Sequence, residues 1–478
     1  MIMEAKKPQL YSKIFDQAQA SPDAPAFLVR HRKDYTAISH MEVLHRVAAV
    51  RSEYMKLPYE RIGYIGENMA DYFSITSGLI ATGKTIAMLD SQAPAADLIN
   101  VISSAELDAV IYDEDMADII EDLAAGLFGL AFIEAAVPDF DESMLADAAD
   151  WAEGDTLFFT SGTSKSSKVV VTPTYAIEGN ITGLNRIRSY APGQAVLMPT
   201  PYFHSYGFTA MHAMYGLGCP VIISSMKTLL KDIALADPVQ AILVPSALDF
   251  LLKKDAINPS LKYLLISGSY LSPELAKKAT DRGITVQNQY GSSEVPTGFA
   301  SNLAGDPIDV LTLSDTVKIE LSPDGEVYIH TENHFKEYYK NTEDTEEMLV
   351  DGVVHSGDLG YLDEAGRLHL LGRRKNMILM ENGDKVFYTD IDDGLNAIDC
   401  IDDAAVIYAE KMLIAVVAPK PGVTQKEIED AIALYNTSQP ISRTIRRIWI
   451  YGDKLPYTSS GKLARSVIEK QYPQVFGR

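Results

Sequence analysis

A loop of small hydroxyl residues lies between two β-rich runs in the first half of the chain. It reads TSGTSKSSK and covers residues 160–168, between LFF and VVV. Small side chains leave backbone N–H groups free to surround an anion, and Lys168 adds a point charge that suits phosphate. The spacing is not G-x-x-x-x-G-K-[ST], which argues against a P-loop nucleotide hydrolase. The loop therefore has the composition of an anion site, although a Ser/Thr-rich loop taken on its own is more often a plain surface turn.

Two later segments place charged groups beside tight turns. In NQYGSSE (288–294), Glu294 follows a strand and a glycine turn, where a single carboxylate can hold Mg²⁺ beside phosphate oxygens. In HSGDLGYLDEAGRLHLLGRRKN (355–376), Asp358 and Arg373 flank a hairpin, and aspartate is a common partner of ribose hydroxyls. Taken alone, the first segment is better explained as a capped helix start.

A fourth segment, LPYTSSGKLARS, covers residues 455–466 and sets Lys462 in a loop of Ser and Thr. By itself such a segment is typical of an exposed turn. The four segments become specific only in combination, through their order along the chain and the separations between them.

Hydrophobic spacing predicts the elements that must position these residues. Short apolar runs alternate with stretches of helical spacing, and strands separated by helices pair in parallel with right-handed crossovers. After about residue 305 the pattern changes to antiparallel hairpins. Strands are expected at 61–66, 85–90, 109–114, 195–201, 220–225, 241–246, 263–269 and 284–292, helices at 69–83 and 94–107, and hairpins at 317–330 and 359–373.

These elements predict an α/β protein of more than one domain, since 478 residues exceed what one core usually serves. We expect a large N-terminal lobe of doubly wound sheets with a small antiparallel barrel, followed by a small α+β C-terminal domain. A polar, basic break at residues 372–376 separates two hydrophobic runs. The expected boundaries are therefore a large domain over 1–371, a hinge over 372–376 and a small domain over 377–478.

The net charge of −23 is unevenly placed. Residues 374–478 hold 14 basic and 14 acidic side chains, so residues 1–373 carry the whole of the net charge. Nucleic acid is not an expected partner, because phosphates require a basic face. Residues 443–478 hold eight basic and two acidic groups. This basic island suits either an ordinary solvated surface or a phosphate-bearing ligand.

The sequence shows no sign of export or of a membrane span. No run of about 18 apolar residues occurs, and the N-terminus lacks the apolar core and cleavage site of a secretory signal. Two cysteines exclude a disulfide scaffold and fit a reducing compartment. We therefore expect a cytoplasmic protein.

In their order and separations, the four segments resemble the motifs of the acyl-adenylate-forming superfamily, the AMP-binding enzymes. This superfamily includes acyl-CoA synthetases, aryl-acid CoA ligases and peptide-synthetase adenylation domains. TSGTSKSSKV resembles its phosphate loop T-S-G-T-T-G-x-P-K-G-V, and YGSSE resembles Y-G-x-T-E. SGD resembles T-G-D, GRRKN resembles G-R-x-K-D, and PYTSSGKLAR resembles P-x-T-x-x-G-K-x-x-R. The resemblance spans about residues 10–470.

The resemblance implies ATP-dependent activation of a carboxylic acid to acyl-AMP with pyrophosphate release, followed by thioester formation with CoA. The implied class is an AMP-forming acid–thiol ligase that uses ATP, Mg²⁺ and CoA. An alternative acceptor is the phosphopantetheine arm of an acyl or peptidyl carrier protein. A third hypothesis is a nucleotide-binding regulator, because Lys165 and Val169 stand where the family has loop glycines and alter the loop geometry.

The resemblance also assigns roles to single residues. Lys462 would stabilise the charge that develops between the carboxylate and the α-phosphate. Glu294 would hold Mg²⁺, and His204 would lie between the ATP and acyl sites. The nucleotide contacts would come from Thr160, Ser161, Gly162, Thr163, Ser164, Lys168, Ser267, Gly268, Ser269, Tyr290, Gly291, Ser293, Asp358 and Arg373.

The family's small domain is a lid that rotates between the two half-reactions. The resemblance places the hinge at Lys375, within the break found from composition. Rotation would withdraw Lys462 and bring Gly383 to the tunnel used by the thiol. Asn382-Gly383 fits a type I′ turn equally well.

Residues near the expected acyl site restrict the acid. Amino-acid-activating members place Asp where this chain has His204, so we expect an acid without an α-amino group. Short-acyl members carry Trp where this chain has Gly291, so the resemblance implies an open pocket floor and a medium-sized or aromatic acid. The expected walls are mainly apolar, with no cation for a second carboxylate: Phe203, Tyr206, Gly207, Ser269, Val295, Pro296, Thr297 and Gly298.

Overall fold

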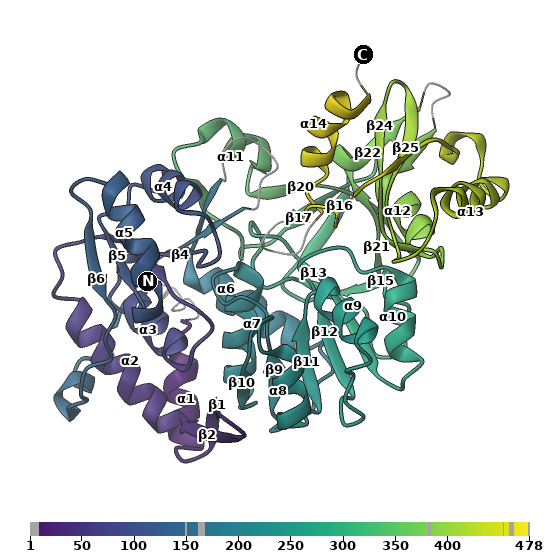
Figure 1. Cartoon of the computed structure of the whole chain (residues 1–478). Coiled ribbons are helices and arrows are strands. Elements are labelled where there is room, and N and C mark those ends of the chain that lie inside the picture. The colour runs from purple at the N-terminus through teal and green to yellow at the C-terminus, as the bar shows by residue number, and fades with distance from the viewer. Residues whose placement is uncertain are drawn as a thin grey trace. The chain divides into compact units, whose positions relative to one another are not determined.

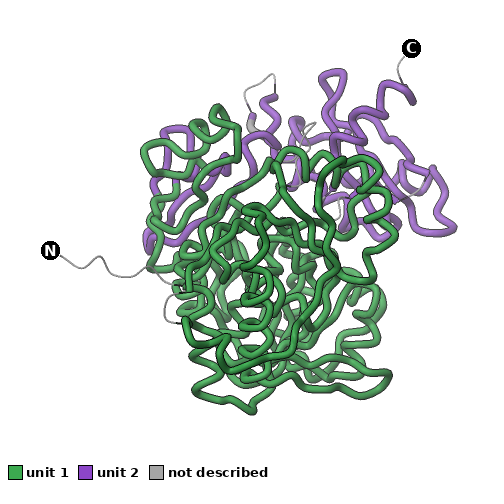
Figure 2. The backbone as a smooth tube through the Cα atoms, turned by 90° about the vertical axis from the view of Figure 1, so that its left-hand side faces the viewer, with its two compact units in different colours: residues 1–319, 329–355 green, residues 320–328, 356–478 purple. Residues whose placement is uncertain are grey.

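The computed structural model describes residues 9–148, 151–160, 168–380, 384–452, 454–457 and 463–476. These residues form two compact units (Figure 2). The first lies within residues 1–319 and 329–355, and the second lies within residues 320–328 and 356–478. Parallel sheets flanked by helices dominate the first unit, and the second ends in a small α+β part. The predicted fold class is confirmed.

A seven-stranded sheet forms one part of the first unit, in the order β18-β8-β7-β4-β3-β5-β6. Its strands β4, β5 and β6 are labelled in Figure 1. Four of its strands are parallel neighbours that come first along the chain: β3 (Arg61–Ile65), β4 (Thr85–Leu89), β5 (Ala109–Tyr112) and β6 (Ala131–Glu134). The crossovers are α3 (Ala70–Ile80), α4 (Ala95–Ser104) and α5 (Ala117–Gly126). The sheet is completed by β7 (Thr156–Phe159), β8 (Val169–Thr172) and β18 (Glu337–Tyr338), of which β8 is antiparallel to both neighbours.

A second sheet in the same unit has mostly parallel strands. Its strands within this unit are β2 (Asp34–Ser39), β1 (Pro25–His31), β10 (Val221–Ile223), β9 (Val196–Met198), β11 (Gln240–Leu243), β12 (Tyr263–Ile266), β13 (Thr285–Tyr290), β14 (Ala300–Ser301) and β15 (Val310–Leu313), in that order. Its helices are α6 (Thr174–Asn185), α7 (Ser205–Gly216), α8 (Leu229–Ala236), α9 (Pro245–Lys253) and α10 (Pro273–Thr280). The alternation predicted from apolar runs is therefore present in both sheets.

One hydrophobic core joins these two sheets. Tyr64 of β3, Phe73 of α3, Met198 of β9 and Phe208 of α7 all belong to it, and each is fully or almost fully buried. Strands covered on both faces read as continuous apolar runs, which explains why these segments were recognisable in the sequence. The remaining elements of the unit are α1 (Ser12–Ala20), α2 (His40–Tyr54), α11 (Thr342–Met348) and β19 (Leu349–Val350).

The second unit contains a hairpin and a small α+β part. The hairpin pairs Asp358 with Arg373, on β20 (Val353–Leu362) and β21 (Leu368–Arg373). A three-stranded sheet follows: β24 (Ile401–Ala409), β25 (Met412–Pro419) and β26 (Ile445–Ile450), beside the short pair β22 (Met377–Leu379) and β23 (Lys385–Phe387). Its helices are α12 (Tyr388–Asn396), α13 (Gln425–Thr437) and α14 (Arg465–Phe476).

The hairpin predicted at 317–330 is also present, as β16 (Lys318–Leu321) and β17 (Glu326–His330). Gly325 has a φ of 91° in the connecting turn, a conformation that glycine adopts without strain. The division into units places residues 356–373 with the C-terminal part, whereas the sequence sets the boundary at 372–376. The domain limits and the hinge at 372–376 stay predictions. Within the described ranges, every helix is too short or too polar to cross a bilayer.

Candidate active site

Thr160 and Lys168 close the base of the predicted phosphate loop. The ladder between β7 and β8 reaches Phe159 and Val169 and continues one step further. The Thr160 N–H donates to the Lys168 carbonyl at 3.1 Å, and the Lys168 N–H donates to the Thr160 hydroxyl at 3.2 Å. Both ends of the loop are therefore fixed to the sheet. Four predicted phosphate contacts lie outside the described residues: Ser161, Gly162, Thr163 and Ser164.

Two neighbours orient the Lys168 side chain. Its Nζ lies 3.1 Å from Asp344 Oδ2 and 4.6 Å from the centroid of the Tyr338 ring. The hydrogen bond from Lys168 is the main cause that holds the pKa of Asp344 below its ordinary value. About a third of each side chain of the ion pair is exposed, so solvent screens it. The pair therefore fixes the position of the ammonium group rather than adding much to the stability of the fold.

Tyr338 also contacts the second motif. Its hydroxyl donates to Glu294 Oε1 at 2.6 Å, and only 2% of Tyr338 is exposed. Tyr338 lies on β18, opposite Val170 of β8. The Phe335 N–H donates to the Glu294 carbonyl at 2.7 Å, which is a second link between the two segments. One tyrosine thus positions the predicted metal ligand Glu294 and the predicted phosphate ligand Lys168 together.

The surroundings of Glu294 fit a cation that takes few protein ligands. Within the described ranges, no group of three or more His, Cys, Asp or Glu side chains could hold a metal ion. Mg²⁺ usually binds one or two carboxylates and completes its shell with waters and substrate phosphates. Glu294 is partly buried and its Oε1 accepts the Tyr338 hydrogen bond, so Oε2 is the oxygen that would bind such a cation.

Asn68 shapes the turn that carries His204 from β9 into α7. Its Oδ1 accepts from the Tyr202 N–H at 2.9 Å, and its Nδ2 donates to the Thr200 carbonyl at 3.0 Å. His204 immediately precedes α7, and its ring lies 4.5 Å from the Phe203 ring between centroids. The predicted gate residue is therefore partly buried at the start of a helix whose entry is fixed by backbone contacts.

Close backbone contacts explain glycine at two expected acyl-site positions. A Cβ on Gly207 would lie 2.0 Å from the Pro201 carbonyl oxygen, and a Cβ on Gly291 would lie 2.3 Å from Gly298 Cα. The expectation of an open pocket floor at Gly291 is therefore wrong, because the backbone of Gly298 occupies that space. A preference for a medium-sized or aromatic acid has to come from other residues.

Helix α6 holds the segment Val295–Gly298, all of which is buried. Asn180 Nδ2 donates to the Pro296 carbonyl at 2.9 Å, and Thr297 Oγ1 donates to the Ile177 carbonyl at 3.4 Å. Thr297 has a φ of 77°, which is strained for a β-branched residue and persists only where the surroundings impose it. Four expected wall residues are thus set by helix packing rather than by local preference.

Tyr206 contacts the end of β12 and the residues that follow it. Its hydroxyl donates to the Leu265 carbonyl at 3.3 Å, and a Cβ on Gly268 would lie 3.8 Å from its ring. Ser267 Oγ donates to the Gln289 carbonyl at 2.8 Å, which ties the two strand ends together. The structure therefore brings the predicted acyl and adenine-side residues to one edge of the second sheet. Four further predicted contacts lie partly buried after the same strands or at their ends: Ser269, Tyr290, Gly291 and Ser293.

In the second unit, Asp358 and Arg373 face each other across the hairpin. They are register partners, and Arg373 Nε lies 2.7 Å from Asp358 Oδ1. Arg373 Nη1 also donates to the Ser356 carbonyl at 3.1 Å. Asp358 is almost completely buried, so the arginine compensates its charge. The prediction that both residues lie on one side of a ribbon is consistent with this pairing.

Three predicted residues belong to the C-terminal unit. Lys375 is exposed within the short 3₁₀ turn Arg374–Asn376, whereas Gly383 and Lys462 lie outside the described residues. The roles of hinge, thiol tunnel and adenylation lysine therefore stay predictions.

Much of the basic island at residues 443–478 is already paired. Arg443 Nη2 lies 2.9 Å from Asp390 Oδ2, and Arg447 Nη1 lies 3.1 Å from Glu410 Oε2. Arg446 is exposed. The net positive charge of the sequence segment is therefore larger than the positive charge its surface presents.

Sequence reasoning missed Tyr338 and Gln289. The segment around Tyr338, KEYYKNTED, matches no phosphate or metal motif, and the site residue Glu294 lies 44 residues away along the chain. Lys168 is farther still. The pairing of β18 with β8 brings Tyr338 to Lys168, and the Phe335–Glu294 backbone hydrogen bond holds the same segment at Glu294. Gln289 directly precedes Tyr290, so the YGSSE motif could have drawn attention to it.

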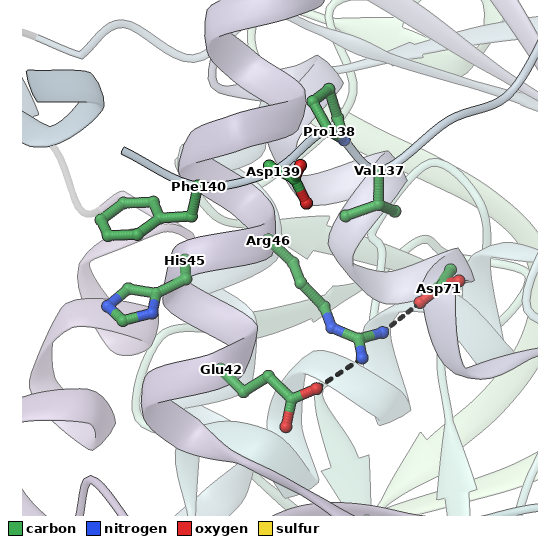
Figure 3. Close-up of a pocket in the computed structure, with 8 residues that line it drawn as sticks. All are labelled: Glu42, His45, Arg46, Asp71, Val137, Pro138, Asp139 and Phe140. Carbon is green, nitrogen blue, oxygen red and sulfur yellow. Dashed lines mark hydrogen bonds and ion pairs between the residues drawn. The ribbon is translucent and has the colours of Figure 1, made fainter. Parts of the chain in front are cut away.

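A surface cavity of about 370 Å³ lies elsewhere in the first unit (Figure 3). In it, Arg46 is drawn between the carboxylates of Glu42 and Asp71, and the His45 and Phe140 rings stack at 3.9 Å between centroids. None of its lining residues is among the predicted site residues. Because Arg46 is already paired with two acidic side chains, we do not assign this cavity to the catalytic site.

Comparison with known proteins gives relatives of nearly the full length. A 2-succinylbenzoate–CoA ligase of Listeria monocytogenes serovar 1/2a is 25% identical over 86% of this chain and 89% of its own length. A protein of the same name from Bacillus cereus is 23% identical over 95% of this chain and 96% of its own.

Solved structures share the fold. The anthranilate CoA ligase AuaEII, solved with anthranoyl-AMP, superposes with a TM-score of 0.86 at 15% identity, covering 99% of this chain and 98% of that one. A benzoate CoA ligase from Burkholderia xenovorans LB400 gives a TM-score of 0.80 at 18% identity over 96% and 99% of the two chains. The model of the family described as AMP-binding enzyme matches residues 14–339, about two-thirds of the chain. The resemblance drawn from the motifs is thereby confirmed, and the chain belongs to the AMP-binding enzyme family.

Proposed function

We propose that this protein is an AMP-forming acid–thiol ligase. In the first half-reaction, a carboxylate oxygen of the acid attacks the α-phosphorus of ATP, the bond to the bridging oxygen breaks, and pyrophosphate leaves. In the second, the thiol of CoA attacks the acyl carbon of the acyl-adenylate, and AMP leaves. Family membership supports the first step, and the CoA-ligase names of the relatives support the second.

The observation that carries this proposal is the joint placement of Glu294 and Lys168 by Tyr338. A carboxylate for Mg²⁺ and an ammonium at the end of the phosphate loop are the groups that adenylation needs, because its transition state concentrates charge on phosphoryl oxygens.

The remaining roles follow the sequence assignments. We propose that Lys462 stabilises charge on the α-phosphate, that Asp358 and Arg373 hold the ribose, and that the small domain rotates about Lys375. His204 would separate the ATP and acyl sites, and Gly383 would border the thiol tunnel. The acid is proposed to be a medium-sized or aromatic one without an α-amino group, consistent with the aryl acids in the relatives' names.

The test is acid-dependent exchange of labelled pyrophosphate into ATP over a panel of carboxylic acids. Exchange with at least one acid is expected, and Lys462→Ala should abolish it. Exchange with no acid would overturn the ligase proposal in favour of the nucleotide-binding regulator. AMP release should then require CoA. If AMP release requires a pantetheinylated carrier protein instead, that protein and not CoA is the acceptor.

A further inference from the structure

Arg188 is a buried cation with neutral partners. It follows α6 in the first unit, and only 7% of it is exposed. Its Nη1 donates to Asn185 Oδ1 at 2.8 Å, and its Nη2 donates to Gln289 Oε1 at 3.1 Å. Its Nε is buried without a hydrogen-bond partner. Both amide oxygens are uncharged, so neither compensates the guanidinium.

Arg51 shows how the same chain treats an equally buried arginine. It is also 7% exposed, but its Nη1 and Nη2 reach the two carboxylate oxygens of Asp147 at 3.1 and 2.9 Å. Its Nε donates to the Ala81 carbonyl at 2.9 Å. No acidic side chain in the described part of the chain forms such a pair with Arg188. Burial without an opposite charge disfavours the charged form and costs several kcal/mol.

The Arg188 guanidinium nevertheless stays charged at neutral pH. Burial lowers the pKa of Arg188 to about 10, so the side chain is still protonated at neutral pH. Tyr206 is its other electrostatic neighbour, and burial raises the pKa of Tyr206, so its phenol is neutral and provides no counter-charge. A buried guanidinium that stays charged without a counter-charge, as in Arg188, indicates a ligand that supplies a hydrogen-bond acceptor for it.

Gln289 supplies a second donor beside Arg188. Only 4% of Gln289 is exposed, and its Nε2 is buried without a hydrogen-bond partner while its Oε1 accepts from Arg188. Its own carbonyl accepts from Ser267, and Tyr290 follows it directly. Two unsatisfied donors are therefore Arg188 Nε, which follows α6, and Gln289 Nε2, which lies in β13. They neighbour Tyr206 and Tyr290, which are expected to line the acid and adenine sites.

We propose that Arg188 and Gln289 form a subsite that recognises a second oxygen-bearing group of the acid substrate, distant from the carboxylate that is activated. The group accepts hydrogen bonds, and a second carboxylate meets both the charge and the two donors best. This inference rests on the proposed ligase function and names its substrate class. It replaces the sequence expectation that the acyl site has no cation for a second carboxylate.

The first experiment measures kcat/KM in pyrophosphate exchange with aromatic acids of matched size: benzoate, the hydroxybenzoates and the benzenedicarboxylates. At least one oxygen-substituted acid should exceed benzoate on the order of 10- to 100-fold, the range of a hydrogen bond to a charged group. If dicarboxylates lead, the acceptor is a carboxylate, and if hydroxybenzoates lead, it is a hydroxyl. A benzoate rate equal to or above all the others overturns the proposal while leaving the ligase function intact. Exchange with none of these acids overturns the subsite as proposed, while the ligase function is decided by the wider panel of carboxylic acids described above.

The second experiment uses Gln289→Glu, a nearly isosteric change that gives Arg188 an internal carboxylate. The KM for the preferred oxygen-substituted acid should rise on the order of tenfold or more, while the KM for benzoate stays within about twofold. Arg188→Met should show the same loss of discrimination. Arg186→Met is the matched control, because Arg186 lies two residues earlier, is exposed and pairs with Asp315.

A purely structural role for Arg188 predicts something else. Gln289→Glu would then raise the melting temperature and change the KM of all acids alike, and this result contradicts the subsite. Arg188→Met is the variant that risks misfolding. If it fails to fold, Gln289→Glu and the wild-type acid panel decide the question by themselves.

Discussion

The Tyr338 hydroxyl donates to Glu294 Oε1 at 2.6 Å while the Tyr338 ring lies 4.6 Å from Lys168 Nζ. The phenol fixes the carboxylate by a hydrogen bond and attracts the ammonium through its ring face. The two groups belong to segments 126 positions apart in the chain, and β18 brings them together because it pairs with β8. A change at Tyr338 is therefore expected to alter catalysis without touching a substrate atom.

Tyr338→Phe removes the hydrogen bond to Glu294 and retains the ring under Lys168. We expect the Mg²⁺ concentration at half-maximal exchange to rise on the order of tenfold or more, in line with the loss of one hydrogen bond to a charged acceptor. Tyr339→Phe is the matched control, because its hydroxyl contacts Glu106 instead. An unchanged Mg²⁺ dependence in Tyr338→Phe would show that Glu294 does not act through this bond.

Asp358→Asn is expected to weaken ATP binding. The change removes the charge that pairs with Arg373 at 2.7 Å and, in our proposal, a ribose ligand. The KM for ATP should rise on the order of 10-fold or more, with the KM for the acid little changed. Arg374→Ala provides a control on the neighbouring position, where the arginine pairs with Asp324 and Glu326. Equal effects on the KM of both substrates would argue for a general loss of folding.

Gly207→Ala should destabilise the first unit. Its Cβ would lie 2.0 Å from the Pro201 carbonyl oxygen, so the backbone before α7 must move. We expect a loss of about 1–3 kcal/mol in unfolding free energy, the range for overpacked sites. Gly452→Ala is the control, because no described atom lies within 4 Å of a Cβ there. Chemical denaturation of both variants measures the difference, and equal midpoints would contradict the contact.

Glu178 makes the stability depend on pH. Burial raises its pKa from 4.5 to about 7, with Lys13 partly opposing the shift; its Oε1 accepts from Thr182 and its Oε2 has no hydrogen-bond partner. The unfolded chain ionises this group first as pH rises, so stability falls between about pH 4.5 and 7.

Glu178→Gln removes that ionisation. The variant should be more stable than the parent at pH 8, by up to about 3 kcal/mol, and should match it below about pH 4.5. Glu347→Gln, at an exposed position, controls for the change in net charge. Thermal unfolding over this pH range is the measurement. A constant difference at all pH values would contradict a buried carboxyl that titrates on unfolding.

The sequence predicted the sheets well because their strands are buried on both faces and read as apolar runs, as at Ile62, Ile86 and Val110. The Asp358–Arg373 pair could also be predicted from the sequence, since the spacing of a hairpin fixes which residues face each other. Both features are set by local periodicity, which a single sequence displays.

Other features depend on packing between distant segments and were not predictable. Tyr338 has no motif of its own, and its role follows from the pairing of β18 with β8. In the sequence, Arg188 cannot be told from a surface arginine. Its burial and the lack of a hydrogen-bond partner for its Nε are visible only in the structure. Gly291 was interpreted as open space, whereas the backbone of Gly298 fills it.

The contact between Gly291 and Gly298 has a consequence for redesign of this enzyme. In principle, a larger residue at position 291 would shorten the acyl site. Here, however, a side chain at 291 would clash with the backbone of Gly298, and no change of rotamer can relieve that clash. Library positions for altering acid selectivity are therefore better placed at Tyr206 and Gln289, which already carry side chains and lie among the proposed acid-site residues. Residues 291 and 298 behave as one unit and would have to be varied together with the loop between them.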